Sequence, residues 1–281
     1  MVMTRFADLH LHTTRSDGYF SPSELVSKGA RLGFSTLAIT DHDTVGGIEE
    51  ASREATRHEI ELIPGIEIST NYGGKSVHIL GYMINIQNAV LLKTLSGIID
   101  KRIERLENMV HRLADLGYPL DISDVFSFIG NRVPGRALLA RYLVKAGYYK
   151  SVGEVFENIL GDSGEVYEPV SVLNPENAIE IINGAGGISS IAHPGNTRVD
   201  EIFPRLVEAG LDGVEAYNPI HTKPVVSHYL KIAQKYDLLV TGGSDYHGPQ
   251  CPARNIGQIK LDYTHVERIK ERAACFEVFG W

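Results

Sequence analysis

The sequence predicts an α/β fold in which parallel strands alternate with helices. The prediction rests on the alternation of strand and helix patterns and on the length and hydrophobic content of the chain. Short runs of β-branched and aliphatic residues alternate with helical patterns in both end regions of the chain. Repeated strand–helix units favour parallel strands joined by right-handed crossovers, hence a barrel or a doubly wound sheet. The 281 residues, 43% of them hydrophobic, suffice for one large domain with an insertion or for two modest domains.

The first α/β segment, residues 1–94, opens on the stretch RFADLHLH, which alternates between two faces. Leu9 and Leu11 point to one side, and Asp8, His10 and His12 point to the other. The remaining elements expected here are a helix over 21–34 with Ser21 as its N-cap, a strand over 36–40, a helix over 45–59, and strands over 60–70 and 76–84.

The middle of the chain reads differently, because it contains helical patterns and no convincing strand. A long amphipathic pattern covers residues 90–116, and three shorter ones cover 121–130, 135–147 and 151–160. We therefore expect residues 95–165 to form a helical insertion that contacts substrate.

Alternation resumes in the last segment, residues 166–281. The strands expected there cover 186–194, 211–219 and 238–248, and the helices begin at Asn174 and cover 199–210, 223–236 and 264–273.

Composition narrows the function. The formal net charge of -8 argues against a protein that coats DNA or RNA, because non-specific binding relies on a basic face. It leaves room for a phosphorylated substrate if bound metal ions supply positive charge locally. Cys251 and Cys275 are too far apart for a Cys-x-x-Cys motif and are expected to be reduced. No apolar run is long enough to span a bilayer, and we expect a cytoplasmic protein.

The placement of the histidines is the strongest functional signal. Four of the 11 histidines lie inside predicted helices, where a solvated helix face explains them. Six others fall at or just after the carboxyl end of a predicted strand, and His78 lies near the start of one. Those six are His10, His12, His42, His193, His221 and His247. Functional groups collect at this rim in barrels and in open parallel sheets.

Acidic residues occupy the same rim. They are Asp17, Asp41, Asp43, Glu67 and Asp245. Each short motif alone could be a core histidine, a polar turn or a loop cap. Together, imidazoles and carboxylates at one rim predict a divalent metal site, with zinc, manganese or iron as the expected ion.

The motifs resemble those of the PHP (polymerase and histidinol phosphatase) family. The resemblance rests on DLHLH, SDG, TDHDT, GIEIS, VHILGY, AHPG and GGSDYHG in this order. The helical insertion is similar to that of the branch containing the 3',5'-nucleoside bisphosphate phosphatases and the exoribonuclease RNase AM. The resemblance implies a distorted (β/α)7 barrel with two or three divalent metal ions at its mouth.

Carried over by motif, the resemblance also implies a ligand set. One ion would bind His10, His12, Glu67 and Asp245, a second would bind Asp17, His42 and His247, and a third would share Glu67 and add His78 and His193. We expect Asp8 to orient a ligand histidine, although a purely structural hydrogen bond would also explain it, and Asp41 and Asp43 could orient a histidine as well.

Two further residues acquire roles from the resemblance. His221 would contact phosphate and protonate the leaving oxygen, although a loop histidine without a role is the alternative. Arg136 would bind a second phosphate, although a helix-surface charge would also explain it. Family members often carry histidine where this chain has Leu138.

The implied function is hydrolysis of nucleotide phosphate esters through attack by a metal-bridged hydroxide. The enzyme would remove the 3'-phosphate of a 3',5'-bisphosphonucleotide or trim short RNA from its 5' end. The alternatives are a phosphomonoesterase like histidinol phosphatase, a metal-binding module without turnover, and, more distantly, a hydrolase of C–N bonds.

Overall fold

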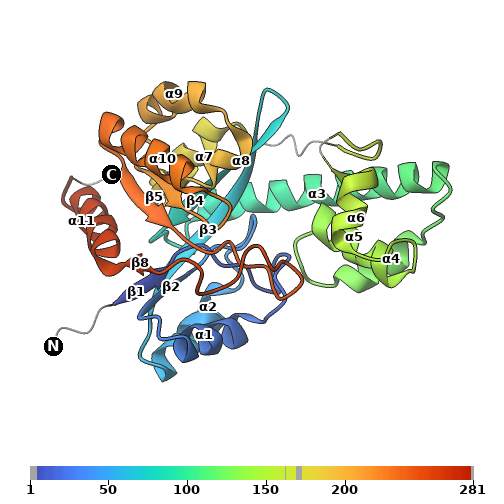
Figure 1. The fold of residues 1–281 in the computed structure, drawn as a ribbon, viewed down its shortest axis with the longest axis horizontal. Helices are drawn as coiled ribbons and strands as arrows, with labels where there is room; N and C mark the ends of the chain where they lie inside the picture. The colour runs from blue at the N-terminus through green and yellow to red at the C-terminus, as the bar shows by residue number, and fades with distance from the viewer. Residues whose placement is uncertain (1–4, 162, 169–172, 280–281) are drawn as a thin grey trace.

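The computed structural model describes residues 5–161, 163–168 and 173–279 (Figure 1). Residues 1–4, 162, 169–172 and 280–281 lie outside the described residues. The start of the first predicted α/β segment and two stretches of the last one are therefore not described. The strands of the described residues form one eight-stranded sheet in the order β7-β6-β5-β4-β3-β2-β1-β8. They are β1 Phe6–Asp8, β2 Thr36–Ile39, β3 Glu61–Tyr72, β4 Lys75–Tyr82, β5 Ile188–Ile191, β6 Gly213–Tyr217, β7 Leu239–Gly242 and β8 Leu261–Asp262.

The sheet closes into a barrel where the chain beyond β1 meets the chain beyond β7. The amide of Leu9 donates to the carbonyl of Gly242 (3.2 Å), and that of Asp245 donates to the carbonyl of His10 (2.9 Å). Leu11 and Tyr246 form a parallel bridge beside them. The predicted barrel class is thereby confirmed, with the seven expected strands present.

Two features depart from a uniform (β/α)7 pattern. Strand β4 runs antiparallel to both of its neighbours, β3 and β5. The unpredicted β8 is only two residues long and pairs antiparallel with β1 at the edge of the sheet. A two-residue strand that ends at a helix is too short to show a periodic pattern in sequence.

Helices cover the outside of the barrel. They are α1 Pro22–Arg31, α2 Ile48–Arg57, α7 Pro175–Gly184, α8 Pro194–Thr197, η2 Asp200–Ile202, α9 Phe203–Glu208, α10 Lys223–Tyr236 and α11 Tyr263–Phe279. As expected, Ser21 caps α1 in a capping box with Glu24. Leu9 and Leu11 are fully buried in two separate core clusters. Because side chains alternate along the strand, His10, which lies between them, points to the inside of the barrel.

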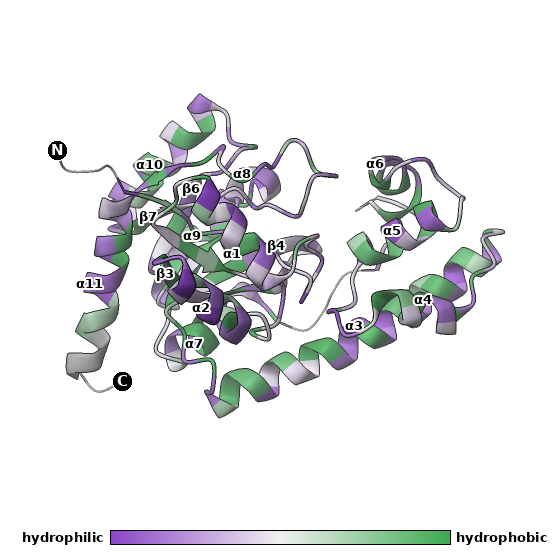
Figure 2. Ribbon diagram, turned by 90° about the horizontal axis from the view of Figure 1, so that it is seen from below, coloured by the Kyte–Doolittle hydropathy of each residue, from purple (hydrophilic) through white to green (hydrophobic). Residues whose placement is uncertain are grey.

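A helical lobe extends from one side of the barrel (Figure 1). It comprises α3 Ala89–Asp115, α4 Ile122–Ile129, α5 Arg136–Lys145, α6 Val152–Val155 and a π-helical turn, η1, Phe156–Leu160. Its core is a separate cluster that includes Leu106, Leu113, Val125 and Leu138. Figure 2 shows α3 running from the barrel into the lobe as one long helix. The predicted boundary at residue 95 therefore falls within a helix, since α3 begins in the barrel core, where its Leu91 is buried.

Gly243 makes the closure of the barrel possible. A Cβ atom at this position would lie 2.3 Å from the backbone nitrogen of His10. We predict that Gly243→Ala lowers the free energy of unfolding by about 1–3 kcal/mol, because the two strand extensions must separate to make room. The measurement is denaturant unfolding followed by circular dichroism. The control is Gly184→Ala at the end of α7, where a Cβ meets nothing within 4 Å; equal stability of the two variants would contradict the prediction.

Candidate metal centre

The barrel mouth gathers most of the predicted histidines because the parallel strands end there together. His10 and His12 follow β1, His42 follows β2, His193 follows β5, and His247 follows β7. His78 lies at the mouth for a different reason. It lies in the first half of β4, and because β4 is antiparallel to its neighbours, the beginning of this strand is at the mouth.

Glu67, in the middle of β3, is the centre of the cluster. Its carboxylate is fully buried, and the imidazoles around it come from five different positions of the chain. The shortest nitrogen–oxygen distances to it are 3.4 Å for His10, 3.3 Å for His12, 2.9 Å for His42, 2.9 Å for His78 and 3.0 Å for His193.

His10, His12, Glu67 and Asp245 have nitrogen–oxygen separations typical of ligands around a single ion. The Nε2 atom of His10 lies 3.4 Å from Glu67 Oε2 and 3.6 Å from Asp245 Oδ1, and the Nε2 atom of His12 lies 3.3 Å from each of the same oxygens. Donors at about 2.0–2.2 Å from a tetrahedral ion are separated by about 3.3–3.6 Å. Each of these four nitrogen–oxygen separations therefore suits two donors on one ion, and the donor atoms of His10, His12 and Glu67 all lie within 4.8 Å of one another.

The other predicted ligands gather beside this set. His247 Nε2 lies 3.3 Å from Asp17 Oδ1, and His12, Asp17, His42 and His247 form one group whose donor atoms lie within 4.8 Å of one another. His42, Glu67 and His78 form another such group. The structure thus brings all nine predicted ligands to one site.

Unsatisfied atoms show that the donors suit a cation. In the part of the chain that is described, His10 Nε2, both ring nitrogens of His12 and Glu67 Oε2 are buried and make no hydrogen bond. Orphaned buried polar atoms are rare because each costs free energy, and bound divalent ions would satisfy these. The clusters of histidine and carboxylate therefore suit divalent metals.

Electrostatics places Glu67 and His12 in the protonation states that metals require. Burial would raise the pKa of Glu67, but His42, His78 and His10 outweigh burial and hold that pKa well below its usual range. Burial, together with His247 and His42, lowers the pKa of His12 to about 3. A charged carboxylate and a neutral imidazole are the ligand forms of these side chains. Burial would lower the pKa of His42, but Glu67 and Asp17 outweigh burial and raise that pKa to about 9, so a bound ion would have to displace a proton there.

One orienting residue was not foreseen. Glu215, in β6, is fully buried and its Oε1 lies 2.9 Å from Nδ1 of His10. Its Oε2 accepts from the backbone amide of His193 (2.7 Å). A carboxylate on the far nitrogen of a ligand histidine fixes the ring and its tautomer. The available signal was an acid inside the apolar strand GVEAY.

Asp8 makes structural hydrogen bonds, which is the alternative to orienting a histidine ring. Its Oδ1 accepts hydrogen bonds from the backbone amides of Ser244 (2.8 Å) and His10 (3.4 Å), and burial raises its pKa to about 7. Asp8 therefore joins the two strand extensions, whereas Glu215 holds the histidine ring.

Asp41 and Asp43, the two acids of the TDHDT motif, also bind groups other than histidine. Asp41 accepts from the Thr13 amide (2.7 Å) and from the Ser16 hydroxyl (2.6 Å). Asp43 forms a buried ion pair with Arg102 of α3 (Nε–Oδ2 2.7 Å), and Arg102 also donates to Ser69 (2.8 Å). This pair ties the lobe to the residue that follows His42.

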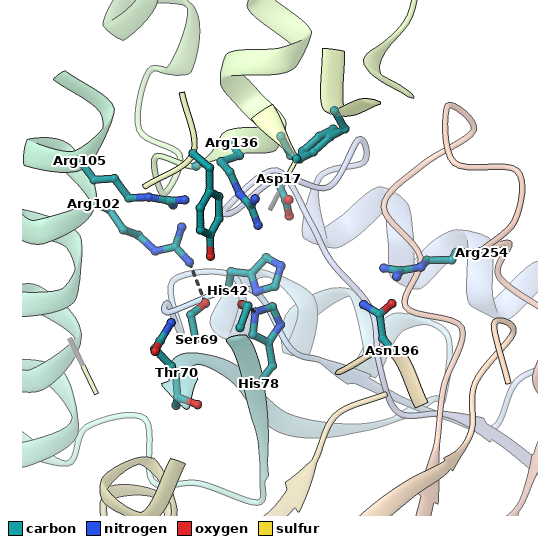
Figure 3. Close-up of a pocket in the computed structure, with 17 residues that line it drawn as sticks. Asp17, His42, Ser69, Thr70, His78, Arg102, Arg105, Arg136, Asn196 and Arg254 are labelled. Carbon is teal, nitrogen blue, oxygen red and sulfur yellow. Dashed lines mark hydrogen bonds between the residues drawn. The ribbon is translucent and has the colours of Figure 1, made fainter. Parts of the chain in front are cut away.

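A cavity of about 510 Å³ lies between the histidine cluster and the lobe (Figure 3). Asp17, His42 and His78 form part of its wall on the barrel side. The lobe contributes Arg102, Arg105 and Arg136. Arg136 donates to the carbonyl of Leu160 (3.0 Å), and its guanidinium lies over the rings of Tyr167 (4.8 Å) and Phe156 (5.8 Å).

His221 is placed differently from the other predicted site residues. Its Nδ1 lies 2.9 Å from the carbonyl oxygen of Ala216, and its Nε2 accepts from the amide of Gly195 (3.2 Å). It is not among the residues that line the cavity. These contacts favour support of the turn after His193, and proton transfer by His221 stays a prediction. Leu138 packs in the lobe core.

Comparison with known proteins identifies the family. The model of the PHP domain matches residues 8–169. The chain belongs to the PHP family. A 5'-3' exoribonuclease of Haemophilus influenzae is 34% identical over 252 residues, which cover 88% of this chain and 92% of that protein. A 3',5'-nucleoside bisphosphate phosphatase of Chromobacterium violaceum is 31% identical, covering 89% of this chain and 90% of that protein.

Solved structures agree with this membership. A structure from Bifidobacterium adolescentis, provisionally described as a metal-dependent phosphoesterase, superposes with a TM-score of 0.89 at 31% identity, covering 95% of this PHP chain and 96% of that one. The predictions of the family and of a phosphoric-ester hydrolase are confirmed. Among the described residues, no helix is both long and apolar enough to cross a bilayer.

The central position of Glu67 yields one prediction. Glu67→Gln preserves shape but removes the charge that faces five imidazoles, so we expect most of the bound manganese to be lost while the fold persists. Metal content by mass spectrometry and circular dichroism measure the two effects. Glu180→Gln, on the exposed face of α7, is the matched control. Full metal content in the Glu67 variant would show that the cluster does not depend on this carboxylate.

Glu215 yields a second prediction. Removing a carboxylate that orients a ligand histidine typically weakens metal binding by about 10- to 100-fold. We expect Glu215→Gln to raise the dissociation constant for manganese by this factor in a calorimetric titration. An unchanged constant would mean that His10 keeps its orientation without Glu215.

Proposed function

We propose that this chain is a divalent-metal-dependent phosphoesterase that cleaves the P–O3' bond of nucleotides carrying a 5'-phosphate. Its substrates would be 3',5'-bisphosphonucleotides and the 5' end of short RNA. The observation that carries the proposal is the single cavity shared by the histidine–carboxylate cluster and the arginines of the lobe. The relatives named above act on the same two kinds of substrate by their names.

The cluster would hold two or three divalent ions, such as manganese, zinc or iron. His10, His12, Glu67 and Asp245 would bind one, as their spacing supports. The other ligands would be Asp17, His42 and His247 for the second ion, and Glu67, His78 and His193 for the third. When bound, such ions supply a nucleophilic water and charge stabilisation at the phosphorus atom.

Arg105 and Arg136 would bind the 5'-phosphate. Burial, together with the neighbouring charges of Arg136 and Arg102, lowers the pKa of Arg105 to about 9. Cations held so close together in a partly dry cavity repel one another, and an anion between them removes this repulsion. The planar guanidinium groups suit the oxygens of a phosphate. Arg102 is already engaged by Asp43 and Ser69 and would position the lobe.

The reaction is the same for both substrates. Water adds to phosphorus, the P–O3' bond breaks, and one proton passes to the departing 3' oxygen. A bisphosphonucleotide releases inorganic phosphate, and an RNA releases its first nucleotide and leaves a 5'-phosphate on the next one. Binding the 5'-phosphate in the lobe would place the 3' oxygen of that nucleotide over the histidine cluster, which is the orientation the cleavage needs.

The test is an assay with manganese that compares a nucleoside 3',5'-bisphosphate, 5'-phosphorylated RNA, AMP and histidinol phosphate. We expect turnover of the first two, loss of activity after chelation, and little turnover of AMP or histidinol phosphate. Preferred hydrolysis of histidinol phosphate would instead support the alternative phosphomonoesterase. Absence of turnover on all four would indicate a metal-binding module.

The role of Arg136 can be isolated by pairing variants with substrates. For the 3',5'-bisphosphate, Arg136→Ala is expected to lower kcat/KM by about 10- to 100-fold, the worth of a charged hydrogen-bonded contact. For a nucleoside 3'-monophosphate the same variant should have a much smaller effect, because the contact partner is missing. Lys101→Ala, exposed on α3, is the control. Equal losses on both substrates would argue against a 5'-phosphate contact.

A further inference from the structure

One side of the cavity has no part in the function proposed so far. Arg254 and Asn196 line it, and Figure 3 shows them across the histidines from Arg102, Arg105 and Arg136. Arg254 comes from the loop after β7, and Asn196 comes from the short helix α8 after His193. The cavity therefore has cationic groups on both sides of the histidine cluster.

Arg254 pairs with Asp245 through only part of its guanidinium group. Its Nη1 atom forms an ion pair with Asp245 Oδ2, and the side chain stays 27% exposed. A guanidinium has five N–H donors, so one ion pair leaves others for a ligand in the cavity. Asp245 also has His10 and His12 within 3.6 Å, so Arg254 is not its sole partner.

The carboxylate beside Arg254 belongs to Asp245, itself a predicted metal ligand, so a bound ion would compete for it with the guanidinium. A fixed guanidinium next to a site for divalent cations repels those cations, since like charges interact strongly at short range. A phosphate between the guanidinium and the cluster turns this repulsion into attraction. Asn196 adds an uncharged donor on the same side: its side chain is exposed, and its backbone amide donates to the carbonyl of His193 (2.9 Å), which fixes the turn.

We propose that Arg254 and Asn196 form a second phosphate subsite, for the phosphate that follows the scissile one on the 3' side. The inference rests on the proposed function, which places the 5'-phosphate in the lobe and the scissile phosphate at the histidine cluster. A strand that enters in this orientation continues away from the lobe, toward Arg254. The subsite selects oligonucleotides with at least one phosphate beyond the cleaved bond.

The test compares two 5'-phosphorylated dinucleotides that differ only in a 3'-terminal phosphate. Release of the first nucleotide is followed by chromatography, with manganese present. The wild-type kcat/KM is expected to be about 10-fold higher with the terminal phosphate, the typical worth of a charge-assisted contact. Arg254→Ala and Asn196→Asp should each bring the ratio close to one, whereas Lys101→Ala should keep it.

The second variant separates recognition from support of the metal site. Arg254→Ala removes a partner of Asp245, but Asn196→Asp leaves that carboxylate untouched and places a negative charge where a phosphate would bind. Metal content is measured for both. The subsite is refuted if the wild-type ratio is close to one, or if the ratio survives in either variant. A wild-type enzyme that cleaves neither dinucleotide nor a 3',5'-bisphosphate would instead refute the proposed function.

Discussion

The carboxylate of Glu67 is the constraint on which the site depends. It is fully buried, it lies within 3.4 Å of five imidazole rings, and those rings come from strands or strand ends all around the barrel. Charged groups this deep are tolerated only when each has a partner. Bound cations would complete this arrangement, because several of the ring nitrogens make no hydrogen bond among the described residues.

The lobe completes the site through a second buried charge pair. Arg102 reaches from α3 to Asp43, one residue after His42, and Pro134 in the lobe accepts a further hydrogen bond from the same guanidinium (2.9 Å). The cavity wall and the cluster are therefore mechanically connected. Substrate contacts on the lobe can keep a fixed distance from the reacting phosphorus, as catalysis by positioning requires.

Much of this arrangement could be predicted from sequence because it follows from strand periodicity. Two histidines separated by one leucine in a strand must point the same way, and the carboxyl ends of parallel strands must share a rim. His78 was predicted only by family resemblance, since its position near the start of a strand is explained by the antiparallel direction of β4. Arg102 was missed because it acts through Asp43, a partner far away in the chain. Glu215 was missed although an acid inside the apolar strand GVEAY was a signal, and Arg254 was missed because no local pattern marks it.

The central claim is that His10, His12, Glu67 and Asp245 bind one divalent ion at the mouth of the barrel. The most direct measurement is anomalous diffraction from crystals grown with manganese. The account predicts a peak coordinated by these four side chains, with one or two more peaks beside it toward Asp17, His42, His78, His193 and His247. Well-ordered crystals without a peak among the four side chains would contradict the account.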